Sequence, residues 1–356
     1  MNRRSLLLCI IVSLAMFVVP ALTFPGESES VTSLKKTDGL YYPPVIQKGP
    51  SGHKVIHDRM TFIEQYKYDN WSPEQAAKGW DKDEELWKKF SWEWGKGTVP
   101  IQRRPMQVLD GLFVLGPEDY QQNTYLFDTG DGLLLVDCGY EKFRPCIEIQ
   151  IRQLGYNLGQ IKWVLLTHGH SDHAESIMAY IGSGADAYLQ ADEPGIKEFL
   201  AAVPPEIARK LVLMHDGDRL SFGPLPVEAI HTPGHTAGST CFSLNWQGTA
   251  VLITGDVVLH FGRHGSMDEG SDWNHYLASL WKLYNHPRSG EWQVILPGHS
   301  TIDLENGRES IYRVLQVTSE IIRRRRAGES LDWLNSYQLF YELRLKGELE
   351  IEPLKN

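Results

Sequence analysis

The chain has 356 residues, of which 42% are hydrophobic and 22% charged, and its formal net charge is −10 at pH 7. This composition is that of an ordinary globular protein and excludes intrinsic disorder, collagen and a continuous coiled coil. The negative charge disfavours nucleic acid as a partner, because phosphate backbones are bound by basic surfaces. The chain has thirteen histidines, and five of them lie at the ends of predicted strands.

Residues 1–23 are typical of a signal peptide. Arg3 and Arg4 precede an apolar run over 6–19 that is interrupted only by Ser13. Such a run is too short to cross a bilayer comfortably, and it matches the apolar core of a leader. We therefore expect cleavage near residue 23, export to the periplasm or the medium, and no stable membrane insertion after the leader is removed. An uncleaved membrane anchor is the alternative.

Residues 24–104 form a tryptophan-rich N-terminal extension. Prolines at 43, 44, 50 and 73 interrupt regular structure, although the spacing predicts a helix over 73–90. Five tryptophans lie in this extension: Trp71, Trp80, Trp87, Trp92 and Trp94. We expect their rings to pack the extension onto the rest of the protein. An apolar lid over a substrate cleft is the alternative.

Residues 105–305 are predicted to form one domain in which short strands alternate with helices. The expected strands span 112–114, 124–127, 133–136, 161–166, 227–230, 241–244, 251–253 and 294–296, and the expected helices span 143–154, 174–181 and 272–285. The stretch 182–226 is a polar interval without a predicted strand. This alternation predicts two sheets with helices on their outer faces. Residues 306–356 are predicted to form a helical C-terminal segment.

A seven-residue motif over 167–173 carries most of the functional information. His168, His170, Asp172 and His173 follow the predicted strand 161–166 directly. Ligand-binding residues of α/β sheets gather at the carboxyl ends of strands. Asp172 and His173 are expected at the start of the following helix, where an aspartate is a favourable cap. Three imidazoles and one carboxylate within six residues indicate a metal site.

Three further candidate ligands follow predicted strands downstream. His235, Asp256 and His299 each come directly after a glycine, which lets the backbone turn sharply. His231 is expected to support its loop rather than to bind metal. Nitrogen and carboxylate ligands without thiolate favour Zn²⁺ in a catalytic site.

In this order, the seven candidate ligands resemble the metallo-β-lactamase superfamily over about residues 107–302. Asp137, in the stretch 136–139, is similar to that family's early Asp-x-Gly motif, in which the aspartate supports the metal loop. The resemblance implies an α+β fold, a four-layer αββα sandwich, with two Zn²⁺ per chain. It further implies that one zinc is held by His168, His170 and His235 and the second by Asp172, His173 and His299, with Asp256 as the bridge.

The resemblance also implies a zinc-dependent metallohydrolase that acts on a small molecule. A hydroxide shared by the two metals would attack a carbonyl substrate, namely a lactone, ester, thioester or lactam. Asp172 and Asp256 are the expected catalytic residues, and Asp172 would orient the nucleophile and pass a proton to the leaving group. Substrate contacts are expected at His260, Arg263 and His264.

The sequence leaves several functions open. His170 stands where oxygen-reducing di-iron members of the family carry glutamate, which favours hydrolysis. Asp256 stands where true β-lactamases generally carry cysteine or serine, so a β-lactamase is a weaker alternative. A one-iron, sulfur-oxidising enzyme of the persulfide dioxygenase type and a zinc-stabilised binding module without activity are also compatible with the residues. The sequence carries no indication of the oligomeric state.

Overall fold

The computed structural model describes residues 105–116, 122–259, 262–267, 270–299 and 302–329, and the backbone of two short strands at 46–48 and 54–56. The predicted leader, the five tryptophans of the extension and residues 330–356 lie outside the described residues. Among the helices that the described ranges contain, none combines the length and apolarity that a membrane crossing requires.

The first sheet has seven strands in the order β3-β4-β5-β6-β7-β8-β9. Neighbouring strands are antiparallel from β3 to β6 and parallel from β6 to β9. The strands are β3 (Met106–Leu109), β4 (Leu112–Leu115), β5 (Thr124–Asp128), β6 (Leu133–Val136), β7 (Ile161–Leu165), β8 (Asp186–Gln190) and β9 (Leu211–Met214). The intervening helices are η2 (Glu141–Phe143), α5 (Arg144–Gln153), η3 (Leu158–Gln160), α6 (Ser171–Ala174), α7 (Ile177–Gly182), α8 (Ile196–Ala202) and α9 (Pro205–Ala208).

The second sheet has eight strands in the order β1-β2-β15-β14-β13-β12-β11-β10. Only β13 and β14 are parallel neighbours among its described pairs. The strands are β1 (Ile46–Lys48), β2 (Lys54–Ile56), β10 (Arg219–Phe222), β11 (Leu225–His231), β12 (Thr240–Trp246), β13 (Thr249–Gly255), β14 (Val294–Pro297) and β15 (Ile302–Asp303). Two helices accompany this sheet, α10 (Trp273–Tyr284) and α11 (Gly307–Arg326).

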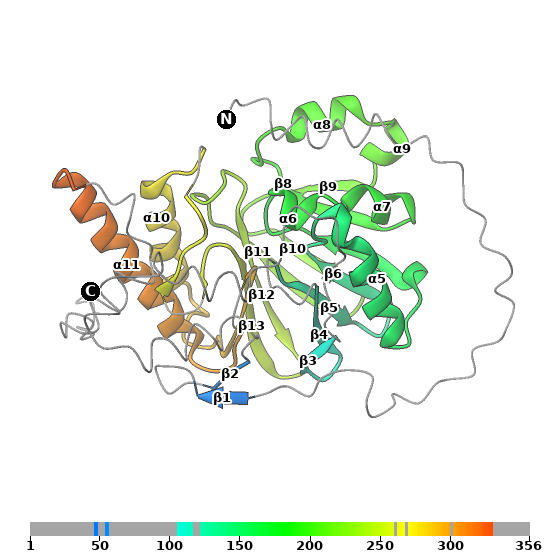
Figure 1. Ribbon diagram of the computed structural model, residues 1–356, viewed down its shortest axis with the longest axis horizontal. Coiled ribbons are helices and arrows are strands. Elements are labelled where there is room, and N and C mark those ends of the chain that lie inside the picture. The colour runs from blue at the N-terminus through cyan, green and yellow to red at the C-terminus, as the bar shows by residue number, and fades with distance from the viewer. Residues whose placement is uncertain are drawn as a thin grey trace, which may run out of the picture.

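Alternate residues of the central strands face different apolar cores. Leu134 and Val136 of β6 point into the core between the two sheets, whereas Leu133 and Leu135 point toward α5 and α7. In the second sheet, Ile253 of β13 faces the inter-sheet core, and its neighbour Leu252 faces α10 and α11. Both faces of both sheets are therefore covered, and the layers run helix, sheet, sheet, helix (Figure 1). The predicted four-layer αββα sandwich is confirmed.

Several elements differ from the sequence expectations. Strands β8, β9 and β10 occupy the interval 182–226, and β1 and β2 occupy part of the extension that was expected to be irregular. Residues of β9 and β10 are partly exposed because β9 and β10 are edge strands. Strand β9 is apolar throughout, and the alternation of polar and apolar residues in β10 extends over only four positions. The helix expected over 174–181 is divided into α6 and α7. Helix α11 packs beside α10 on the second sheet, so the described part of 306–356 shares an apolar core with the preceding domain.

The direction of the strands places five loops at one edge of the sandwich. Strands β6, β7 and β8 are parallel, so their carboxyl ends lie together at one edge of the first sheet. In the second sheet, β13 and β14 are parallel, and β11 runs in the same direction because two antiparallel pairings separate it from β13. The loops after β6, β7, β11, β13 and β14 contain the candidate site residues.

Candidate metal centre

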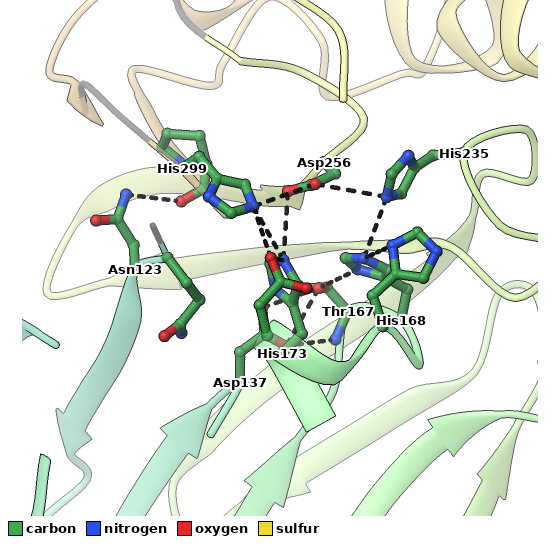
Figure 2. A network of polar contacts seen from close by, with 12 residues as sticks. Asn123, Asp137, Thr167, His168, His173, His235, Asp256 and His299 are labelled. Atoms are coloured by element: carbon green, nitrogen blue, oxygen red, sulfur yellow. Dashed lines mark hydrogen bonds and ion pairs between the residues drawn. The ribbon is translucent and has the colours of Figure 1, made fainter. Parts of the chain in front are cut away.

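All seven predicted ligands lie close together where these loops meet. His168, His170, Asp172 and His173 come from the loop after β7 and from the short helix α6, and His235, Asp256 and His299 follow β11, β13 and β14. Figure 2 shows five of them, His168, His173, His235, Asp256 and His299, with their side chains turned toward one another. Three groups of potential ligands are found among the described residues, and together they contain these seven residues and no others.

The first group consists of three imidazoles, His168, His170 and His235. His168 Nε2 lies 3.1 Å from His170 Nδ1 and 3.2 Å from His235 Nε2. His168 and His235 are buried, whereas His170 is partly exposed. The three nitrogens therefore converge on one point that is open on the side of His170.

The second group consists of Asp172, His173 and His299. His173 Nε2 lies 3.2 Å from His299 Nε2, and Asp172 Oδ2 lies 3.3 Å from the same His299 nitrogen. His173 is fully buried, whereas the side chains of Asp172 and His299 are 22% and 19% exposed. This group is also open on one side.

Asp256 lies between these two groups, and it forms the third group with His168 and His173. Its Oδ2 is 3.4 Å from His235 Nε2 of the first group and 3.3 Å from His299 Nε2 of the second. Its Oδ1 is 3.6 Å from His173 Nε2 and has no hydrogen-bond partner among the described residues, although it is buried. A buried carboxylate oxygen without a partner costs free energy unless another group compensates for it. Asp256 is therefore placed to share a cation with either group.

Three of the imidazoles are held by a hydrogen bond at the ring nitrogen that faces away from the site. His173 Nδ1 donates to Asp137 Oδ2 at 2.8 Å, and His235 Nδ1 donates to the carbonyl of Ser266 at 2.7 Å. His168 Nδ1 lies 3.0 Å from the hydroxyl of Thr167, which itself donates to Asp137. A protonated outer nitrogen leaves the inner Nε2 as an acceptor of a metal ion.

The charge state differs between the two groups when no cation is bound. Burial lowers the pKa of His170 to about 4 and holds the pKa values of His168 and His235 below the ordinary value, so the first group is neutral. Burial opposes the charge on the second group, but neighbouring carboxylates raise the pKa of His173 to about 9 and of His299 to about 10. Burial also opposes the charge of Asp172, but His173 and His299 outweigh it and lower the pKa of Asp172 to about 2. The second group therefore has two positive imidazoles and one negative carboxylate, and the neighbouring carboxylate of Asp256, whose pKa the same histidines hold well below its usual range against burial, balances the remaining charge.

The ligand separations fit a small tetrahedral cation such as Zn²⁺. With metal–ligand bonds of about 2.0–2.2 Å, ligand atoms around a tetrahedral ion lie roughly 3.3–3.6 Å apart. Five of the six separations between ligand atoms within the two groups are 3.1–3.6 Å, and the sixth, between His170 and His235, is within 4.8 Å. His168 Nε2 and His235 Nε2 face each other, and both rings carry their proton on Nδ1. A cation between these two unprotonated nitrogens would therefore stabilise the contact. The residues therefore fit the implied metals.

Two of the glycines that precede ligands are required by close approach. Gly255 has φ +48°, and a Cβ at this position would lie 2.7 Å from the side chain of Thr167. A Cβ at Gly298 would lie 2.4 Å from Asp256 Oδ1. Any side chain at either position would displace the residues around the metal groups.

Comparisons with known proteins agree with this geometry. The family model of the metallo-β-lactamase superfamily matches residues 117–285. The lactamase-like protein aptB of Emericella nidulans is 31% identical over 235 residues, which cover 65% of this chain and 70% of that protein. The chain belongs to the metallo-β-lactamase superfamily.

Other relatives match a shorter part of the chain. The lactamase-like protein adaB of Aspergillus niger is 31% identical over 161 residues, which cover 45% of each protein. An atrochrysone carboxyl ACP thioesterase of Paecilomyces divaricatus is 28% identical over 190 residues, which cover 51% of this chain and 54% of the thioesterase. The chain thus spans about half the length of these two curated relatives.

Solved structures of the superfamily share the fold. A metallo-β-lactamase family protein from Thermus thermophilus superimposes with a TM-score of 0.52 at 21% identity, over 68% of this chain and 95% of that protein. A subclass B3 metallo-β-lactamase from a soil metagenome library gives a TM-score of 0.50 at 20% identity, over 66% and 100% of the two chains. At this level of identity, the likeness establishes the αββα sandwich.

In this member of the superfamily, the predicted accessory residues lie outside the metal groups. His231 Nε2 donates to the carbonyl of Ala237 at 2.7 Å, which is a contact within its own loop. His264 packs edge-on against Trp273 and donates from Nδ1 to the carbonyl of Gly265 at 2.5 Å. Arg263 is partly exposed in the loop after Asp256, and His260 lies outside the described residues. The proposed substrate contacts therefore remain predictions.

The structure also identifies residues around the site that the sequence analysis did not select. Asn123 Nδ2 donates to the carbonyl of Pro297 at 3.1 Å (Figure 2). Tyr125 Oη donates to the same carbonyl at 2.7 Å, and Asn123 N donates to the carbonyl of Gly298 at 2.6 Å. Glu193 lies in the turn after β8 and contacts the loops of the first group. The parallel pairing of β8 with β7 could have indicated Glu193, because it brings the end of β8 to the ligand edge.

Proposed function

We propose that this chain is a dinuclear zinc hydrolase that cleaves a small carbonyl substrate: a thioester, ester, lactone or lactam. The observation that carries the proposal is the pair of adjacent three-ligand groups joined by Asp256. Each group is buried where it faces the protein interior. The first group is open to solvent at His170, and the second is open at Asp172 and His299. A purely structural zinc site is closed by four protein ligands, whereas a catalytic site keeps an open position.

Zinc bound at such a site lowers the pKa of bound water to about 7 and polarises a carbonyl oxygen. Asp172 is the more exposed of the two proposed catalytic carboxylates, at 22% against 7% for Asp256. Because its pKa is held at about 2, Asp172 is ionised near neutral pH and can accept a proton that is then passed to a leaving group. Asp256 contacts ligands of both groups and thereby fixes their positions relative to each other.

The relatives support acyl transfer as the chemistry. One of them is described as a thioesterase and two others as lactamase-like, and all three names refer to proteins that match this chain over limited lengths. A thioester and a lactam both contain a carbonyl carbon that water can attack. A thioester is therefore the first substrate class to test, followed by lactones, esters and cephalosporins.

The decisive experiment combines metal analysis with a substrate panel on purified protein. We expect two zinc ions per chain and hydrolysis of at least one carbonyl substrate, with loss of activity after chelation and recovery on addition of Zn²⁺. One iron per chain, no zinc and oxidation of a persulfide would favour the dioxygenase alternative. Turnover of cephalosporins alone would favour a β-lactamase. A fully zinc-loaded protein that hydrolyses no member of the panel would contradict the proposal.

We also propose that the protein is exported by the leader at 1–23. The support is the pair Arg3 and Arg4 before an apolar run. Expression of the full chain with a C-terminal tag, followed by fractionation and N-terminal sequencing, tests this proposal. We expect a mature N-terminus near residue 24 in the exported fraction, and a full-length chain retained in the membrane fraction would contradict it.

A further inference from the structure

Glu193 is a buried carboxylate that the proposed chemistry does not use. It lies in the turn between β8 and α8, and the residue is only 4% exposed. Its Oε2 accepts a hydrogen bond from Thr236 Oγ1 at 2.9 Å, and its Oε1 has no partner of good hydrogen-bond geometry among the described residues. Burying a carboxylate is costly, so its position between the ligand loops requires an explanation.

The side chain of Glu193 separates two glycines that belong to different ligand loops. Gly169 stands between His168 and His170, and a Cβ there would lie 2.8 Å from Glu193 Cγ and Oε1. Gly238 follows His235 by three residues, and a Cβ there would lie 2.4 Å from Glu193 Oε2. Both loops therefore pack with their backbones directly against this one side chain.

A chain of hydroxyl groups extends the contact into the loop of His235. Ser239 Oγ accepts a hydrogen bond from the backbone N–H of Thr236 at 2.9 Å and lies 3.0 Å from Thr236 Oγ1. Because the Thr236 hydroxyl donates to Glu193, the Ser239 hydroxyl is left to donate to Thr236. Consecutive hydrogen bonds of this kind strengthen one another in a buried environment.

We propose that Glu193 is a positioning residue that sets the distance between the loop of His168 and His170 and the loop of His235, and thereby the geometry of the first metal group. This inference rests on the proposed function, since it assumes that the first group binds a metal ion. The contacts of Glu193 described above reach neither the loop of Asp256 nor that of His299. Its removal should therefore affect the first group more than the second.

The raised pKa of Glu193 agrees with a role in packing the two loops together rather than in supplying a negative charge. Burial raises its pKa to about 7, against the opposing effect of Thr236 and of the backbone amides of Gly169 and Gly238. The carboxyl group is thus partly protonated near neutral pH. Glutamine resembles the protonated form in size and retains an oxygen that can accept from Thr236.

The test uses variants in which only one metal group is intact. His299→Ala leaves the first group, and His170→Ala leaves the second; Glu193→Ala is then added to each, and Zn²⁺ affinity is measured by competition with a chromogenic chelator. In the His299→Ala background, we expect Glu193→Ala to weaken binding by about 10–100-fold, the range for residues that orient ligands. In the His170→Ala background, we expect a change of less than about 3-fold on the same scale.

Three further variants separate positioning from general damage to the fold. Glu193→Gln should restore affinity to within about 3-fold of the parent, and Thr236→Val, which removes one hydroxyl at constant volume, should give an intermediate loss. The matched control is Gln150→Ala, which truncates a buried side chain that is bonded to the backbone of Gly116 on the outer face of the first sheet. It should lower stability and leave both affinities unchanged.

The outcomes distinguish this inference from the proposed function. Equal losses in both backgrounds, or no loss in either, would overturn the role of Glu193 and leave the hydrolase proposal intact. Failure of Glu193→Gln to restore affinity would overturn the packing role. If the parent chain bound no zinc at either group, the proposed function itself would fall, and this inference with it.

Discussion

Asp137 Oδ2 accepts a hydrogen bond from His173 Nδ1 at 2.8 Å, while Asp137 Oδ1 accepts from the backbone N–H of Thr167 at the same distance. One buried carboxylate thus orients a ligand of the second group and anchors the start of the loop that carries the first. Asp137 adopts φ +55°, a left-handed conformation that aspartate and asparagine tolerate better than other residues with a side chain.

Asp137→Asn tests this relationship because asparagine suits the same backbone. The neutral amide cannot hold the charge of His173 or accept from both partners as the carboxylate does. We expect zinc affinity at the second group to fall by about 10–100-fold while the fold is retained. Metal content after dialysis and the circular dichroism spectrum provide the measurement, and a variant with full zinc content would contradict the prediction.

Asp256→Ala and His170→Ala should each remove activity without unfolding the protein. The apolar core between the sheets does not include either side chain. We expect kcat/KM to fall by about 10²–10⁴-fold, as for loss of an acid–base or charge-stabilising group, with a near-native far-UV spectrum. Persistent hydrolysis of a chromogenic ester by both variants would show that the reaction takes place elsewhere.

Asn123 and Tyr125 are expected to stabilise the segment before His299. Both donate to the buried carbonyl of Pro297. Loss of one donor by Tyr125→Phe should lower the free energy of unfolding by about 1 kcal/mol. Loss of both donors should lower it further, because the carbonyl then lacks these partners and its desolvation costs about 1–3 kcal/mol. Urea unfolding measures the cost, and additive effects of the two single variants would argue against a shared acceptor.

Zinc binding should depend on pH at the second group and hardly at the first. His173 and His299 have raised pKa values of about 9 and 10 without metal, so both carry protons near pH 7 that a cation must displace. Affinity at the second group should therefore rise with pH until it passes these pKa values, by up to about 100-fold per pH unit when two protons leave. The first group, with the pKa of His170 at about 4, should bind with nearly constant affinity from about pH 5 to 8.

Calorimetric titrations in buffers of different ionisation enthalpy measure this proton release directly. The variants His299→Ala and His170→Ala isolate the two groups. Release of no protons by the second group, or of two by the first, would contradict the assignment of charge.

The sequence alone was sufficient to predict which seven side chains the structure brings together and the layers of the fold. The motif over 167–173 is compact, and each later candidate follows an apolar run and a glycine, so local patterns located all seven side chains. The edge strands β9 and β10 are not evident from the sequence because each has only four residues, β9 is apolar without alternation, and the alternation in β10 is too short to stand out.

The supporting residues could not be predicted in the same way. Glu193 reaches Thr236 across 43 positions, and Asn123 reaches Pro297 across 174. Such contacts depend on which strands are neighbours, and no local pattern marks them. The carboxylate Asp137 was selected only because a family motif contains it.

Each metal group draws its members from both sheets: two from the loop and short helix after β7, and one from a loop of the second sheet. A cation at either group would act as a crosslink between the two halves of the sandwich, much as a disulfide joins distant segments. Loaded protein should therefore resist separation of the sheets under force at this edge more strongly than at the opposite edge. The edge that carries the metal groups would then be the part of the sandwich that most resists mechanical separation of the two sheets.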